Sequence, residues 1–147
     1  MKTFPYYIQH DAMDCGPTCL RMVSGYYGKN LPVRTLRDRC HISREGVSLL
    51  SISEVAESIG FLATGVKITW EQLRDEMPLP CIVHWNQKHF VVVYGIKKRR
   101  GKVIVKVADP AAGLFDYDAE SFLKCWMQND GAGKYGIALM LEPTPDF

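Results

Sequence analysis

The residues best suited to chemistry in this chain lie near its amino terminus, in the segment from Gln9 to Leu20. In this segment, Cys15 stands where a polar, turn-prone stretch gives way to an amphipathic helical pattern. A thiol at a helix start lies at the positive end of the helix dipole, and the thiolate is the reactive form of cysteine. Given a histidine and an acid from elsewhere, Cys15 is therefore a candidate nucleophile, and Gln9 is a candidate donor to the oxyanion of acyl transfer.

One of the 4 histidines would have to act as the base. His89 is the best candidate because it opens the most apolar strand pattern, at an end from which a side chain can point into a cleft. His10 is close to Cys15 in sequence, but its segment is expected to form a cleft wall. His41 follows a helical pattern and is expected to be exposed, and His84 lies inside an apolar strand pattern, which favours a structural role.

The acid that orients the histidine should also lie at the end of an element. Asp109 directly follows the strand pattern that ends at Ala108, in a turn that contains Pro110 and Gly113. If this strand and the one that begins at His89 are hairpin neighbours, Asp109 and His89 fall at one edge of the sheet. An aspartate before proline also commonly caps a turn, and spacing alone does not separate the two roles.

The elements that must position these residues divide the chain into two halves. Apolar residues recur at helical spacing from Gly16 to about Ile59, with helices that stop at Gly28, open at Pro32 and run from Ser48 to Gly60. Strand patterns dominate afterwards, at residues 61–68, 81–85, 89–96, 102–108 and 135–141, with helices expected near 70–77 and 119–126. Helices followed by antiparallel strands predict an α+β domain.

Composition limits the class of protein. The chain has 147 residues, of which 47% are hydrophobic and 23% charged, as in one globular domain with a buried core. The net charge of +2 is too small to indicate nucleic-acid binding, and the run Lys97–Arg100 before Gly101 is typical of a solvated hairpin turn. No apolar run approaches the roughly 20 residues that span a bilayer, and no signal peptide is recognisable, so we expect a soluble, cytosolic chain.

The 5 cysteines show no pairing pattern and are expected to be free thiols, most of them buried. Cys19 follows Cys15 by one helical turn and is expected to face the core. No second ligand cluster with zinc spacing exists, so no metal site is predicted.

Three separated motifs resemble those of the bacteriocin-processing cysteine peptidases, the amino-terminal domains of peptidase-containing ABC transporters. They occur here in the same order as in that family: Gln9 with Asp14–Leu20, then His89–Tyr94, then Asp109–Pro110. The similarity covers nearly the whole chain, including Gly46–Leu50 and the tail Leu141–Phe147. The resemblance implies a papain-like cysteine peptidase fold, with Cys15 as nucleophile, His89 as general base, Asp109 as its orienting partner and Gln9 as oxyanion donor.

The resemblance also implies a substrate and a setting. The substrate would be a leader peptide ending in Gly-Gly or Gly-Ala, cleaved after that pair while the cargo is exported. The partners would be the transmembrane and ATPase domains of a parent ABC transporter, at the cytoplasmic side of the bacterial inner membrane. The peptidase domain would need no cofactor, and ATP would be used by the separate nucleotide-binding domain. Residues 1–142 would form the peptidase domain, and residues 143–147 would begin a linker to a transmembrane domain.

Two other functions stay open. Some members of this family lack the cysteine and serve as docking domains for the leader peptide without hydrolysing it. This chain keeps Cys15, His89 and Asp109 and is therefore expected to be competent. A different thiol-dependent enzyme, such as an amidase or a transglutaminase-like acyl transferase, is disfavoured only by the full-length resemblance. An amphipathic leader helix would need an apolar groove outside the active site, and exposed apolar residues of the helical half are candidates for it.

Overall fold

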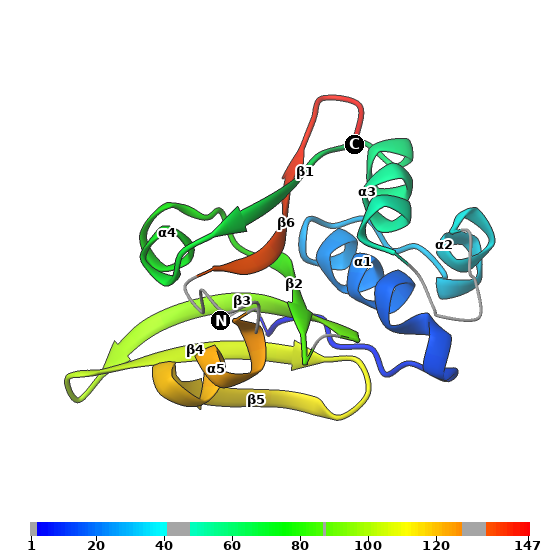
Figure 1. The fold of residues 1–147 in the computed structure, drawn as a ribbon. Coiled ribbons are helices and arrows are strands. Elements are labelled where there is room, and N and C mark those ends of the chain that lie inside the picture. Colours follow the sequence, from blue (N-terminus) through cyan, green and yellow to red (C-terminus); the bar gives the residue numbers. More distant parts are fainter. Residues whose placement is uncertain (1–2, 41–47, 87, 128–134) are drawn as a thin grey trace.

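The computed structural model describes residues 3–40, 48–86, 88–127 and 135–147 (Figure 1). Helical elements come first, at η1 (Ala12–Asp14), α1 (Cys15–Tyr26), α2 (Val33–Arg39) and α3 (Leu49–Ser58). The later elements are mostly strands: β1 (Phe61–Ile68), α4 (Trp70–Glu76), β2 (Cys81–Trp85), β3 (His89–Arg99), β4 (Lys102–Asp109), β5 (Gly113–Asp118), α5 (Ala119–Trp126) and β6 (Gly136–Pro143). The predicted α+β order, a helical half followed by an antiparallel sheet, is confirmed.

Local sequence signals explain where several helices begin. Ser48, where this helix was predicted to begin, is the N-cap of α3, because its side chain accepts a hydrogen bond from the backbone N–H of Ser51. Asp118 caps α5 in the same way. After α3 the chain reverses at Gly60, whose φ of 107° lies in the left-handed region that favours glycine. The helix predicted to open at Pro32 begins one residue later, since Pro32 is the N-cap of α2.

The strands in the described part of the chain form one antiparallel sheet in the order β1-β6-β2-β3-β4-β5. The last strand, β6, lies between β1 and β2, with Val66 opposite Ala138 and Val83 opposite the same residue on its other side. Strands β3 and β4 form the hairpin predicted around the basic run. The start of β3 and the end of β4 therefore meet at the same end of the sheet (Figure 1).

Both faces of the sheet are covered, which explains the consecutive apolar residues of β3. Phe90 and Val92 belong to the buried cluster that contains the apolar faces of α1, α2 and α3. Val91 and Val93 belong to the opposite cluster, which contains residues of α4 and α5. The sheet is thus the central layer between the helical half and the two later helices.

The structure also differs from the sequence-based elements in places. Strand β5 was not predicted. Gly113 was expected to lie in a turn, but it is the first residue of this strand, which pairs with β4. Asp109 is consequently the last residue of β4 rather than a residue beyond it. Of the basic run, Lys97 to Arg99 lie in β3 and the turn itself falls at Arg100 and Gly101, all exposed as predicted.

The carboxyl-terminal residues lie against the domain. The backbone N–H and the hydroxyl of Thr144 both donate to the carbonyl of Gly60, at 2.9 and 2.7 Å. The ring of Phe147 lies 4.7 Å from that of Phe61. The boundary at residue 142 and the linker role of residues 143–147 stay predictions.

Two sequence-based expectations concern residues outside the described ranges: His41, and Gly46 with Val47 of the segment Gly46–Leu50. Among the helices that are described, none is both long enough and apolar enough to cross a membrane.

Candidate active site

Cys15 is the first residue of α1, as the sequence predicts. Its side chain is 6% exposed, and the helix behind it rests on the sheet through Cys19, Leu20 and Val23, which are all fully buried. The preceding turn is shaped by Asp11, whose carboxylate accepts a hydrogen bond from the N–H of Met13 at 2.9 Å. The fold therefore holds the Cys15 thiol at the amino-terminal end of a long, packed helix.

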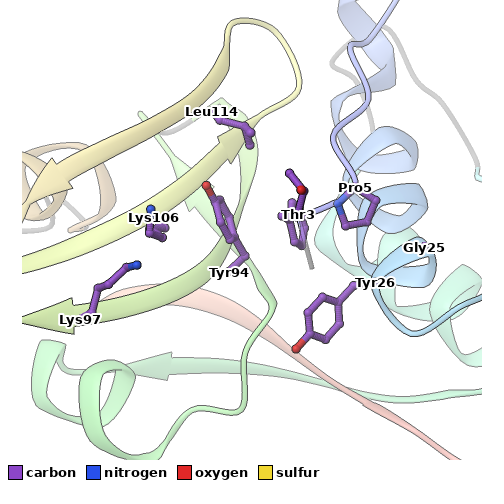
Figure 2. Close-up of a pocket in the computed structure, with 9 residues that line it drawn as sticks. Thr3, Pro5, Gly25, Tyr26, Tyr94, Lys97, Lys106 and Leu114 are labelled. Carbon is purple, nitrogen blue, oxygen red and sulfur yellow. The ribbon is translucent and has the colours of Figure 1, made fainter. Parts of the chain in front are cut away.

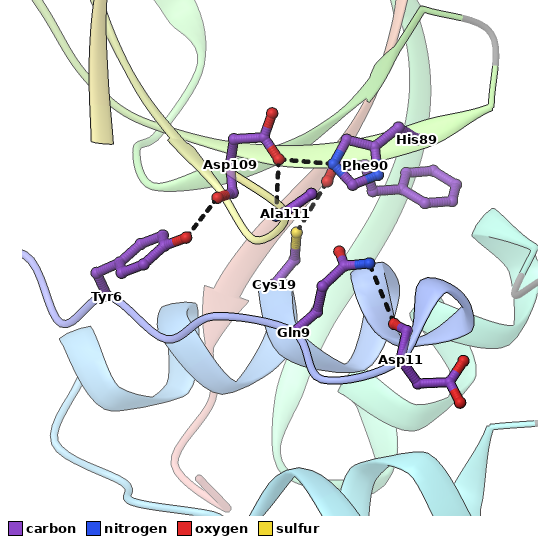
Figure 3. A network of polar contacts seen from close by, with 8 residues as sticks. All are labelled: Tyr6, Gln9, Asp11, Cys19, His89, Phe90, Asp109 and Ala111. Carbon is purple, nitrogen blue, oxygen red and sulfur yellow. Dashed lines mark hydrogen bonds and ion pairs between the residues drawn. The ribbon is translucent and has the colours of Figure 1, made fainter. Parts of the chain in front are cut away.

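His89 and Asp109 meet at the edge of the β3–β4 hairpin, as predicted (Figure 3). Nε2 of His89 lies 2.7 Å from Oδ1 of Asp109. Because a carboxylate only accepts hydrogen bonds, this ring nitrogen carries a proton. Cys15 lies close enough to the same ring to raise the pKa of His89, and Nδ1 is the ring nitrogen that Asp109 leaves free. The structure thus brings together a thiol, an imidazole and a carboxylate from three separate elements.

The electrostatics of this cluster favour a charged imidazole. Burial lowers the pKa of His89, but the hydrogen bond with Asp109, the nearby Cys15 and the charge of Asp109 outweigh burial and raise the pKa to about 9. Burial likewise raises the pKa of Asp109, yet its hydrogen bonds with His89 and Ala111 bring the pKa below its usual value. At neutral pH, His89 is therefore an imidazolium and Asp109 a carboxylate.

Asp109 makes both of the contacts that its sequence position allowed, to a turn and to a histidine. Its Oδ1 atom accepts a hydrogen bond from the N–H of Ala111 at 2.9 Å, so it does cap the turn. The same oxygen bonds His89, so the turn cap fixes the carboxylate in position for the imidazole. The backbone carbonyl of Asp109 accepts a further hydrogen bond from the hydroxyl of Tyr6 at 2.7 Å (Figure 3).

Gln9 lies in the extended segment before η1, with its side chain directed toward the sheet that carries His89 (Figure 3). Its backbone N–H donates to the carbonyl of Pro110 at 2.8 Å, which ties it to the turn after Asp109. Its Nε2 donates to the carbonyl of Asp11 at 3.1 Å. A primary amide has two N–H donors, so a second donor is available at this nitrogen.

The structure also describes His10, His84 and Cys19. His10 is exposed, and its place in a cleft wall stays a prediction. His84 lies within β2, with its ring 5.3 Å from that of Phe90. Cys19 is fully buried, and its thiol donates to the carbonyl of Phe90 at 3.4 Å. Burial raises the pKa of Cys19 well above its ordinary value, so this second thiol stays protonated.

Sequence analysis missed the groups that hold the site together. Tyr6 supports the strand end that carries Asp109, and Arg37 on α2 lies 3.2 Å from the buried carboxylate of Asp14. Neither residue belongs to a recognisable motif. The available signal for Arg37 was Asp14 beside Cys15, because a charge that becomes buried there requires a partner from elsewhere in the fold.

A cavity of about 500 Å³ lies at the opposite end of α1 from Cys15 (Figure 2). Its lining combines aromatic and apolar side chains with two lysines: Thr3, Phe4, Pro5, Gly25, Tyr26, Tyr94, Lys97, Lys106 and Leu114. None of the candidate catalytic residues lines it. Tyr26 is one of the exposed apolar residues of the helical half.

The sequence is similar to curated bacterial proteins that are much longer. It is 30% identical over 148 residues to the probable microcin-H47 secretion/processing ATP-binding protein MchF of Escherichia coli, covering 99% of this chain and 19% of that protein. It is 32% identical over 154 residues to the lactococcin-G-processing and transport ATP-binding protein LagD of Lactococcus lactis, covering 100% of this chain and 20% of that protein. The chain therefore spans about a fifth of the length of these relatives.

Solved structures match nearly the whole fold. A double glycine motif protease from an AMS/PCAT transporter, crystallised with the leader peptide, superposes with a TM-score of 0.83 at 34% identity, covering 95% of this chain and 91% of that one. The peptidase domain of Streptococcus ComA, a bifunctional ABC transporter involved in a quorum-sensing pathway, gives a TM-score of 0.76 at 28% identity, covering 97% of this chain and 100% of that one. These matches confirm the papain-like α+β fold.

The model of the Peptidase C39 family matches residues 3–130, which include every candidate catalytic residue. This match covers most of the chain and agrees with the relatives and with the solved structures. The chain belongs to the Peptidase C39 family of cysteine peptidases.

Proposed function

We propose that this chain is a cysteine endopeptidase that removes the leader peptide from an exported precursor by cleaving after a Gly-Gly or Gly-Ala pair. The observation that carries the proposal is the 2.7 Å contact between His89 and Asp109, with Cys15 at the start of α1 close enough to the same imidazole to raise its pKa. Family membership supports the class of reaction, and the processing functions named for the relatives support the class of substrate.

In the first step, the sulfur of Cys15 attacks the carbonyl carbon of the second glycine. The carbonyl π bond breaks and its electron pair moves to oxygen. His89, held as an imidazolium by Asp109, then gives its proton to the leaving nitrogen as the peptide bond breaks and the electron pair on oxygen re-forms the carbonyl. The products are a thioester between Cys15 and the leader, and the free amino terminus of the cargo.

In the second step, His89 acts as a base because it has lost a proton. It accepts a proton from a water molecule, whose oxygen attacks the thioester carbon. The carbon–sulfur bond breaks, which restores the Cys15 thiolate beside the imidazolium and releases the leader with a new carboxyl group, which then loses its proton to solvent. Asp109 keeps the ring oriented through Nε2 in both steps.

Two donors would stabilise the oxyanion in each step. One is the second N–H of the Gln9 side chain, and the other is the backbone N–H of Cys15 at the first position of α1. The hydrogen bond from Gln9 to the carbonyl of Asp11 supports this role because it limits the positions that the amide can take.

The preference for small residues follows from the crowding of the site. Cys15 is almost completely buried and His89 is only 23% exposed, so the backbone of a substrate must approach closely to reach the sulfur. Glycine has no side chain to obstruct that approach.

We further propose that the domain acts as part of an ABC transporter, at the cytoplasmic side of the bacterial inner membrane. Its partners would be the leader peptide and the transmembrane and ATPase domains of that transporter. Hydrolysis by this domain would consume only water and need no cofactor, while ATP would be used by the nucleotide-binding domain.

The test is cleavage of a synthetic precursor that carries an amphipathic leader, a Gly-Gly pair and a short cargo. We expect the mass spectrum to show cleavage after the second glycine, and no cleavage by Cys15→Ala. A precursor with Val-Val in place of Gly-Gly should resist cleavage.

Persistent cleavage by Cys15→Ala would reject Cys15 as the nucleophile. Binding of the precursor without cleavage by the unaltered chain would instead favour the docking function. Cleavage of unrelated amide substrates in preference to the precursor would favour another thiol-dependent enzyme.

A further inference from the structure

Arg37 connects α2 to the turn that carries the candidate nucleophile. Its Nε atom lies 3.2 Å from Oδ1 of Asp14, and its Nη2 atom lies 3.7 Å from Oδ2 of Asp11. Helix α2 packs beside α1 but contributes no candidate catalytic group. Arg37 therefore reaches across from a neighbouring helix to the residue that directly precedes Cys15.

Asp11 accepts the hydrogen bonds that hold this turn together. Its carbonyl oxygen accepts hydrogen bonds from the N–H of Asp14 at 3.0 Å and from Nε2 of Gln9 at 3.1 Å. Its carboxylate accepts a third from the N–H of Met13. A shift of Asp11 would therefore move the Gln9 amide and the start of α1 together.

Asp14 carries a buried charge next to Cys15. The residue is 3% exposed, and its Oδ1 atom has no hydrogen-bond partner within the described ranges. Burial raises the pKa of Asp14, while the positive charges of Arg37 and His10 lower it in part and the nearby carboxylate of Asp11 opposes them. An uncompensated carboxylate here would also disfavour a thiolate at Cys15, since like charges repel.

We propose that Arg37 is a positioning residue for the reaction at Cys15. It holds Asp11 and Asp14 so that the Gln9 amide and the Cys15 N–H face the same point, and it offsets the charge of Asp14 beside the thiolate. This inference rests on the proposed roles of Cys15 and Gln9, but it is independent of which peptide is cleaved.

Alkylation of Cys15 by iodoacetamide at pH 7 tests the electrostatic part without any peptide substrate. Mass spectrometry of the fragment that contains Cys15 gives the rate constant. We expect Arg37→Gln to slow alkylation several-fold, because the uncompensated carboxylate of Asp14 disfavours the reactive thiolate. Arg37→Lys, which keeps the charge, should restore most of the rate.

The decisive variant adds Asp14→Asn to Arg37→Gln. Removal of the unpaired carboxylate should recover most of the lost alkylation rate while the circular dichroism and thermal midpoint of Arg37→Gln and of the double variant stay equal, a combination that a merely structural role of Arg37 does not predict. The matched control is Arg39→Gln on the same helix, because Arg39 bonds Ser58 and not the turn. This control should react like the unaltered chain.

The positioning part is tested with the Gly-Gly precursor. Arg37→Gln should lower kcat about tenfold and change KM less than twofold, because Arg37 orients donors that act on the oxyanion. The proposal is overturned if Arg37→Gln alkylates at the unaltered rate, or if it loses rate through unfolding that Asp14→Asn does not reverse. Failure of the unaltered chain to cleave the precursor would reject the proposed function instead, and the alkylation series would still decide the role of Arg37.

Discussion

His89 shows how the site depends on a balance of opposing effects on one side chain. Burial alone would keep the imidazole neutral, yet Asp109 and the nearby Cys15 raise its pKa to about 9. Asp109 supplies the larger part of this rise in pKa, through a hydrogen bond and through its charge. The protonation state of His89 at neutral pH is therefore a property of the cluster and not of the histidine.

Replacement of Asp109 by Asn should change the pH dependence of cleavage. In the unaltered chain, kcat/KM should fall as the pH rises through about 9, where His89 loses the proton that it gives to the leaving nitrogen. Asp109→Asn removes the negative charge, so burial dominates and the pKa of His89 falls. We expect the fall of kcat/KM on the alkaline side of the pH–rate profile to begin below pH 9, and kcat/KM itself to drop roughly 10²- to 10⁴-fold.

A pH–rate profile from pH 5 to about 10.5 checks this expectation, with NMR titration of the His89 ring as an independent measurement. A limb that stays near pH 9 in Asp109→Asn would mean that another group controls it. Asp116→Asn serves as a control, because Asp116 pairs with Lys106 and Arg99 rather than with His89.

Gln9→Ala should lower kcat about 10²-fold, the order of magnitude for the loss of one oxyanion donor, with little change in KM. The fold should tolerate the change because the bond from the Gln9 backbone N–H to Pro110 remains. Single-turnover kinetics with the precursor give both constants. A rise in KM at unchanged kcat would instead identify Gln9 as a substrate-binding residue.

At the scale of elements, the site lies where the start of α1 meets the open end of the β3–β4 hairpin. Helix α1 supplies Cys15, and the antiparallel pairing of β3 with β4 brings His89 and Asp109 to one edge. The bonds from Tyr6 to Asp109 and from Gln9 to Pro110 then connect the amino-terminal segment to that edge. Each element fixes one reacting group, so the geometry depends on how the elements pack.

The junction of α5 with β6 provides a test of this packing. A Cβ atom at Gly136 would overlap the indole ring of Trp126, which is 1% exposed and donates to the carbonyl of Ile137 at 3.0 Å. We expect Gly136→Ala to reduce the free energy of unfolding by about 1–3 kcal/mol, as for other overpacked sites. Urea unfolding followed by fluorescence measures the change.

Gly65→Ala is the matched control on the neighbouring strand β1. A Cβ there would lie 3.5 Å from the Leu49 side chain, an ordinary contact distance. Its free energy of unfolding should stay within about 0.5 kcal/mol of the unaltered chain. Equal effects of the two substitutions would show that Trp126 does not restrict position 136.

At the scale of the whole molecule, the sheet separates two hydrophobic clusters with different tasks. The cluster of α1, α2 and α3 supports the candidate nucleophile and the face of β3 next to it. The opposite cluster, with Phe122 and Trp126 of α5, contains none of the candidate catalytic residues. Stability and activity should therefore respond differently to changes in the two clusters.

Phe122→Ala should reduce the free energy of unfolding by about 3–5 kcal/mol, because it removes a fully buried aromatic side chain. At a temperature where the variant stays folded, kcat should change less than threefold, since Phe122 lies across the sheet from Cys15. Thermal unfolding measures the loss of stability, and precursor cleavage at a temperature below the transition measures kcat. A large fall in kcat in the folded variant would show that the second cluster also positions the site.

Much of this arrangement was determined by the sequence alone. Cys15 at a helix start, Ser48 as a cap, and His89 with Asp109 at the ends of a hairpin follow from periodicity and turn residues, which act between near neighbours in the chain. Only the tertiary structure decided that β6 lies between β1 and β2, that Gln9 is tied to Pro110, and that Arg37 faces Asp14. Those contacts join residues far apart in sequence, or on separate helices, so they depend on how the packed surfaces fit rather than on any local pattern.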